Sequence, residues 1–142
     1  MRPSTIATGG VVVLGLLGLA GATAAASAGA DHGTIDMATE GAAFYGNYDY
    51  YPTNVRHGAF HYWGYLDDLL DDGDRVKVEI RVEGYGPRIH WAPLDADATV
   101  DAERYDPQVT QTEHAWVKVC RDRGFPEPDN CREKPYPRVD PK

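Results

Sequence analysis

The sequence predicts an all-β protein: a single-domain antiparallel β-sandwich, immunoglobulin-like or jelly-roll-like, of about six to eight short strands with one C-terminal disulfide loop. Three observations predict this fold class. Apolar and polar residues alternate with a period of two in several segments. Turn-forming residues recur about every ten residues. No stretch of about ten residues has the apolar spacing of an amphipathic helix.

The clearest strand covers residues 76–82, where valine and isoleucine alternate with charged side chains. This pattern is typical of a strand with one buried and one solvated face. Residues 114–119 repeat it, with His114, Trp116 and Lys118 on the polar side. Weaker segments, rich in aromatic or β-branched residues, are in chain order 43–51, 58–66, 89–91 and 99–105, the last of which also fits one helical turn.

The C-terminal part contains many prolines. Five of them follow Gly124 and argue against further regular structure, because proline has no backbone N–H and a fixed φ. The sequence therefore predicts a domain over residues 31–132 and a flexible, Pro-rich tail over residues 133–142.

Residues 1–30 have the pattern of a secretory signal peptide. Arg2 precedes ten uncharged, mainly apolar residues, and small residues follow, with cleavage sites after Ala28 or Ala30. Ten residues extend only about 15 Å as a helix, too short to cross a bilayer, so a cleaved signal is favoured over a retained anchor. The predicted location is secreted, in the extracellular space, with no membrane attachment after cleavage.

The mature chain would be strongly acidic, because removal of Arg2 leaves 13 basic against 22 acidic residues, a net charge of −9. Such a surface repels phosphate groups, so no nucleic-acid partner is expected. Cys120 and Cys131, the only two cysteines, predict a disulfide in an exported chain.

Several catalytic chemistries are excluded by composition. No serine follows Ser27, and no phosphate-binding glycine loop or H-E-x-x-H motif occurs. Pairing of both cysteines would also remove the thiol nucleophile. The chain is therefore expected not to be an enzyme, although a carboxylate- or His-based hydrolase stays open because 22 acids offer many pairs.

The acidic segment LDDLLDDGD raises the question of a cation site. A loose calcium site would use Asp68, Asp71, Asp72 and Asp74, since extracellular calcium modules bind with carboxylates at millimolar affinity. The favoured alternative is a solvated turn before the strand at 76–82, with no cofactor. An EF-hand is disfavoured because Leu70 cannot coordinate and a strand, rather than a helix, follows.

His57 and His61 are spaced H-x-x-x-H. In a strand they would be about 13 Å apart, too far to share one metal. Ordinary strand or interface histidines are therefore the favoured interpretation.

Aromatic residues are the better indication of binding. Trp63 and Tyr65 alternate with Tyr62 and Leu66, and Trp116 lies on the polar side of its strand. Together with Trp91 and His114 they form the candidate ligand-binding set, for an extracellular carbohydrate or protein partner. The alternative is that these side chains are covered on both faces of the sandwich.

The leader together with WVKVCRDRGFPEPDNC, residues 116–131, resembles small secreted proteins of high-GC Gram-positive (actinobacterial) type. The resemblance supports secretion and the disulfide and implies no activity. Three functions are considered: a non-enzymatic binding module, a small inhibitor of a secreted hydrolase that uses the loop 120–131, and a small carboxylate- or His-based hydrolase. In the inhibitor, Arg121 and Arg123 would suit a trypsin-like pocket.

Overall fold

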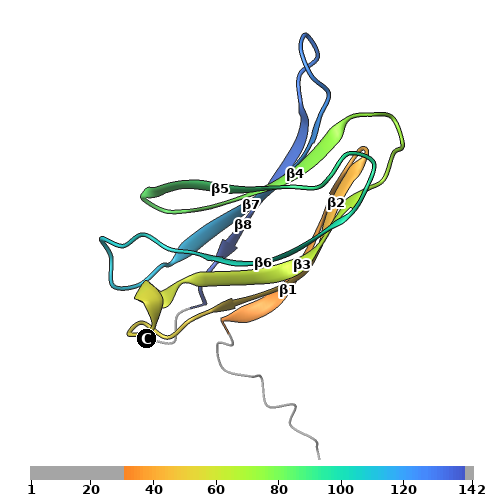
Figure 1. The fold of residues 1–142 in the computed structure, drawn as a ribbon. Coiled ribbons are helices and arrows are strands. Elements are labelled where there is room, and N and C mark those ends of the chain that lie inside the picture. Colours follow the sequence, from red (N-terminus) through yellow and green to blue (C-terminus); the bar gives the residue numbers. More distant parts are fainter. Residues whose placement is uncertain (1–30, 140–142) are drawn as a thin grey trace, which may run out of the picture.

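The computed structural model describes residues 31–139 and confirms an all-β sandwich, in two four-stranded antiparallel sheets ordered β1-β2-β3-β6 and β5-β4-β7-β8 (Figure 1). In chain order the elements are β1 (His32–Thr39), β2 (Ala42–Tyr50), the 3-10 helix η1 (Arg56–Gly58), β3 (Phe60–Asp68), β4 (Arg75–Val82), β5 (Tyr85–Trp91), β6 (Ala98–Arg104), β7 (His114–Asp122) and β8 (Asn130–Pro137). The predicted signal peptide lies outside the described residues.

The connections have the immunoglobulin-like form. β3 pairs with β6 in one sheet, and β4 pairs with β7 in the other. The chain crosses between sheets at β3–β4, β5–β6 and β6–β7. These pairs correspond to the B–E and C–F pairs of immunoglobulin sandwiches, and β1 and β2 extend the first sheet beyond β3.

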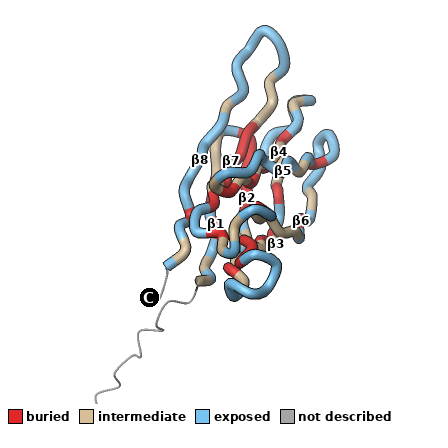
Figure 2. Tube along the Cα trace, turned by 90° about the vertical axis from the view of Figure 1, so that its left-hand side faces the viewer, coloured by how far each residue is buried: buried red, intermediate tan, exposed pale blue. Residues whose placement is uncertain are grey.

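The two sheets contribute different side chains to the core. The first contributes mainly aromatic rings, including the fully buried Phe44, Phe60 and Tyr62. The second contributes valine and isoleucine from β4 and β7, as the period-two pattern predicted. The buried tyrosines keep polar partners: Tyr50 donates to the carbonyl of Tyr136 at 2.6 Å, and Tyr62 Oη lies 2.8 Å from His90 Nε2. The buried residues form one core cluster, and the buried positions lie along the strands while the connecting loops are mostly exposed (Figure 2).

Two strands were not predicted. β1 has a weak sequence pattern, and β8 lies where a loose tail was expected. The tail prediction is wrong for residues 133–137, which pair with β7. Pro135 and Pro137 are accommodated because β8 is an edge strand, where a missing N–H costs no ladder bond. Pro87 lies within β5, the other edge strand of the same sheet, and is accommodated for the same reason.

Arg138 anchors the chain after β8. Its guanidinium, with a side chain only 5% exposed, pairs with Asp31 at 3.2 Å. It also donates to the carbonyl oxygens of Tyr51, Gly58 and Thr112 at 2.7–2.9 Å. Arg138 therefore links the segment after β8 to the loop around η1 and to Asp31, the residue before β1.

Candidate functional site

None of the three tryptophans belongs to the core, but they lie on opposite sides of the sandwich. Trp63 and Tyr65 are on β3, in the first sheet, and point away from buried Tyr62 and Leu66 as predicted. Trp91 is on β5, and His114 and Trp116 are on β7, in the second sheet. The structure therefore divides the predicted five-residue set into two separate surfaces.

The outer surface of the first sheet is centred on two tyrosines. Tyr45 on β2 and Tyr65 on β3 are directly opposite in the register, and their exposed fractions are 41% and 62%. Directly opposite side chains on neighbouring strands have Cβ atoms about 5 Å apart. Trp63 is the next outward residue of β3 and is partly buried. The term "aromatic face" is used below for Tyr45, Tyr51, His61, Trp63 and Tyr65.

Three rings of the aromatic face stack on one another along β3. The His61 and Trp63 rings are 4.7 Å apart, and the Tyr51 and His61 rings are 5.5 Å apart, each pair within 26° of parallel. His61 Nε2 lies 2.9 Å from Asp101 Oδ1 on β6, which orients the imidazole. Because these rings cover one another, the more open faces belong to Tyr45 and Tyr65.

A close approach of β2 and β3 supports this surface from beneath. Gly46 and Gly64 are paired, and a Cβ on either would lie 2.1–2.2 Å from a carbonyl oxygen of the other strand. Those oxygens belong to Trp63 and Tyr45, two residues of the aromatic face. Only glycine at both positions allows this spacing.

The outer surface of the second sheet is different, because its tryptophans are in contact with cations. Arg75 and Lys77 lie over the Trp91 ring at 4.6 and 5.1 Å, and Arg81 lies 4.0 Å over Trp116. The His114 ring also stacks on Trp116, at 6.0 Å.

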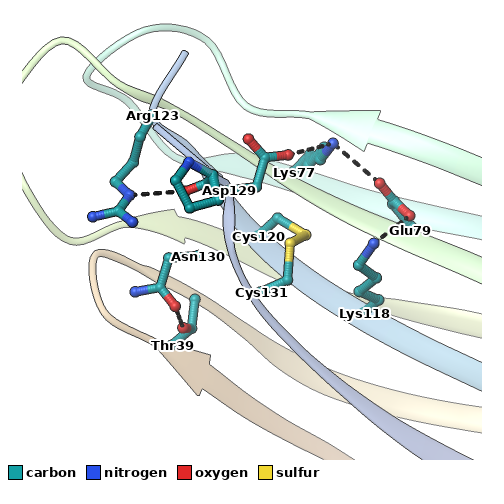
Figure 3. Close-up of a disulfide and its surroundings, with 10 residues drawn as sticks. Thr39, Lys77, Glu79, Lys118, Cys120, Arg123, Asp129, Asn130 and Cys131 are labelled. Carbon is teal, nitrogen blue, oxygen red and sulfur yellow. Dashed lines mark hydrogen bonds and ion pairs between the residues drawn. A yellow bond between two sulfur atoms is a disulfide. The ribbon is translucent and has the colours of Figure 1, made fainter. Parts of the chain in front are cut away.

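Charged side chains on this sheet are joined in ion pairs. Glu79 pairs with both Lys77 and Lys118, and Lys77 also pairs with Asp129 beside the disulfide (Figure 3). Trp116 is partly buried and Trp91 is 38% exposed, and cations lie over both rings, so both are less open to a ligand than Tyr65.

The acidic connection before β4 is occupied by an arginine. Asp72 and Asp74 both pair with Arg121 on β7. Asp68 accepts the backbone N–H of Leu70, and Asp71 is exposed. Within residues 31–139 no group of three or more His, Cys, Asp or Glu side chains is arranged to hold a metal ion. The four predicted aspartates are thus not brought together.

The predicted disulfide is present, and it joins neighbouring strands. Cys120 on β7 is paired directly with Cys131 on β8 (Figure 3). The hairpin loop above it extends beyond the body of the sandwich (Figures 1 and 2). Phe125, in this loop, is fully exposed. Sequence reasoning missed Phe125, although a Phe followed by Pro between two cysteines was a visible signal.

The loop arginines are engaged within the protein. Arg121 is held by the two aspartates, whereas Arg123 pairs with Glu127 at 3.5 Å and donates to the carbonyl of Pro128 at 3.1 Å. Neither side chain is thus presented freely to a protease pocket.

A hydrolase would need a cleft with paired titratable groups. The His61–Asp101 pair lies beside a hollow of about 290 Å³, lined by Tyr51, Arg56, His61, Arg88, Asp101, Ala102 and Glu103. This lining has no serine, threonine or cysteine nucleophile. His61 Nε2 is already bonded to Asp101, whose side chain is 72% exposed. The pair meets only the minimum geometric requirement for a hydrolase.

Comparison with protein-family models, with curated proteins and with solved structures finds no match for this chain. In the described part of the chain, no helix has the length and apolar character needed to cross a membrane.

Proposed function

We propose that the protein is a secreted, non-enzymatic binding module and that its ligand-binding surface is the aromatic face of the first sheet. The observation that carries the proposal is the exposure of Tyr45 and Tyr65 opposite each other on adjacent strands. Tyr and Trp offer large, rigid contact areas at low entropic cost, together with a polar end for hydrogen bonds.

A carbohydrate chain is the ligand class that fits this surface best. Polar side chains surround the rings, including Asn47 on β2 and Asp101 on β6, both paired with Trp63 in the register. Carboxylates and amides bond sugar hydroxyls, while rings stack on the apolar faces of sugars. The cores of protein–protein interfaces are instead depleted of charged residues.

Retention on insoluble polysaccharides tests this proposal. Purified protein is mixed with a panel of polysaccharides, and the bound fraction is compared with that of Tyr65→Ala. We expect retention on at least one matrix and about tenfold weaker binding for Tyr65→Ala. Trp116→Ala, on the opposite side of the sandwich, is the matched control and should bind as the parent does. Absence of retention on every matrix, or equal loss in both variants, would reject the proposal.

We propose the disulfide-closed loop as a second candidate, an inhibitory loop that inserts into a secreted hydrolase. Full exposure of Phe125 favours it. Aromatic residues held in pre-organised loops often dominate protein–protein binding. The disulfide and the Arg123–Glu127 pair hold the loop without using Phe125.

A protease-inhibition panel tests the second candidate. Inhibition should be weakened by Phe125→Ala and by reduction of the disulfide, and it should be retained in Tyr65→Ala, on the outer surface of the first sheet. Inhibition that is indifferent to reductant, or no inhibition across the panel, would remove this candidate.

A further inference from the structure

The edge strands β5 and β6 face each other at one side of the sandwich (Figure 1). Two arginines connect them across this side. Arg104 of β6 donates from Nε to the carbonyl of Gly86 on β5 at 2.9 Å. Arg88 of β5 reaches the carbonyl of Glu103 on β6 at 3.4 Å. Each guanidinium has five N–H donors, so both retain donors beyond these contacts.

Two shallow hollows flank this junction, and both are lined by Arg88 and Glu103. Each has a volume of about 290 Å³. The first is also lined by Arg104 and by the rings of Tyr85 and Tyr105. The Tyr85 ring lies 4.3 Å from the Arg104 guanidinium carbon and so holds that group in place.

The charge at this junction is opposite in sign to that of the whole protein. Glu103 is paired with Arg56 at 2.5 Å. Within the described residues, neither Arg88 nor Arg104 has a carboxylate within ion-pair distance. The lining of the two hollows carries three guanidinium groups, from Arg56, Arg88 and Arg104, against the two carboxylates of Asp101 and Glu103, in a chain whose net charge is −8. The positive charge of Arg88 also reinforces burial in lowering the pKa of His90.

We propose that this junction is a binding site for a small oxyanion, a carboxylate, sulfate or phosphate group, held by the guanidinium groups of Arg88 and Arg104. Arginine binds such groups through parallel N–H donors, and the pairing is strengthened by its full charge. The two hollows leave room beside the anion for a sugar-sized body. Arg88 and Arg104 lie outside the aromatic face, although Tyr51 and His61 of that face line the second hollow, and the variants below test the anion site separately from the proposed function.

An NMR titration of the ¹⁵N-labelled protein tests the site. Sodium sulfate, inorganic phosphate and sodium glucuronate are the probes, with sodium chloride at matched ionic strength and neutral glucose as controls. We expect saturable shifts at the amides of Gly86, Arg88 and residues 103–105, absent with chloride and glucose. A preference for glucuronate over sulfate and phosphate would identify a sugar acid, and the reverse order would identify an inorganic group.

Three variants separate binding from a purely structural role. Arg88→Gln should weaken the apparent affinity about tenfold, and Arg88→Lys, which keeps the charge but has fewer donors, should weaken it less. Arg75→Gln is the control, because Arg75 lies over Trp91 on the outer surface of the second sheet, away from the two hollows. Linear or scattered shifts, or a lowered melting temperature in Arg88→Gln with unchanged anion affinity, would overturn the proposal.

Discussion

Replacement of Arg138 by alanine is predicted to be among the most damaging single changes outside the hydrophobic core. The side chain bonds three backbone carbonyls, on Tyr51, Gly58 and Thr112, and pairs with Asp31. Its guanidinium carbon also lies 4.7 Å over the Tyr50 ring. Truncation to alanine would remove all of these contacts. The three carbonyls and the carboxylate of Asp31 would then remain partly buried without their bonds to Arg138.

The magnitude follows from the buried ion pair. Removal of one partner of a buried pair typically costs about 3–5 kcal/mol, because the other charge remains uncompensated. The freed carbonyls add to this where water cannot reach them. A domain of this size is stable by about 5–15 kcal/mol. Arg138→Ala should therefore lose a large share of the free energy of unfolding, and Arg138→Lys, with fewer donors in a different geometry, should lose less.

Urea unfolding of the parent and the variants measures the effect. Arg132→Ala is the matched control: Arg132 lies on β8, is exposed, and makes one long bond to the carbonyl of Ala38. Its substitution should change stability by no more than about 0.5 kcal/mol. A loss below about 1 kcal/mol for Arg138→Ala would refute the claim that the segment after β8 anchors the fold.

Three further predictions concern stability. Gly64→Ala should cost about 3 kcal/mol or more, because its Cβ would lie 2.2 Å from a backbone oxygen; Gly86→Ala, with nothing within 4 Å, is the control and should be nearly neutral. Burial, aided by the charge of Arg88, lowers the pKa of His90 below its ordinary value of about 6.5. As the pH falls, His90 is therefore protonated more readily in the unfolded chain than in the folded one. Stability should thus fall as the pH drops below about 6.5, and unfolding curves at pH 7 and 5 should show a smaller difference in His90→Gln; an unchanged difference would contradict the assignment. Reduction of the Cys120–Cys131 disulfide, which spans 11 positions, should lower stability by at most about 3 kcal/mol in the chain-entropy estimate; no change once free thiols are confirmed would show that the hairpin does not need it.

Much of the fold could be predicted because the two central strands of the second sheet have strongly alternating sequences. β4 and β7 bury every second residue, and the sequence shows this directly. β8 could not be predicted in the same way, since exposed charges and prolines occupy most of its positions. β8 forms because it pairs with β7 and because Tyr136 is buried. Neither contact can be read from the local sequence.

The candidate site was predictable only in part. Alternation along β3 placed Trp63 and Tyr65 on the outer surface, as the structure shows. The same reasoning could not reveal that Trp91 and Trp116 lie on the other sheet, because sheet membership depends on strand order. Nor could it reveal the cations over those two rings, which come from neighbouring strands.

The central claim, that the aromatic face binds the ligand, is tested most directly by mapping the contact surface. The ¹⁵N-labelled protein would be titrated with a soluble oligosaccharide, prepared from the polysaccharide that retains the protein in the binding assay. The chemical shifts of its amides would be followed during the titration. We predict that the largest shifts cluster at Tyr45, Asn47, Trp63, Tyr65 and Asp101 on β2, β3 and β6. Shifts centred on β4 and β7, or on the loop around Phe125, would contradict the account.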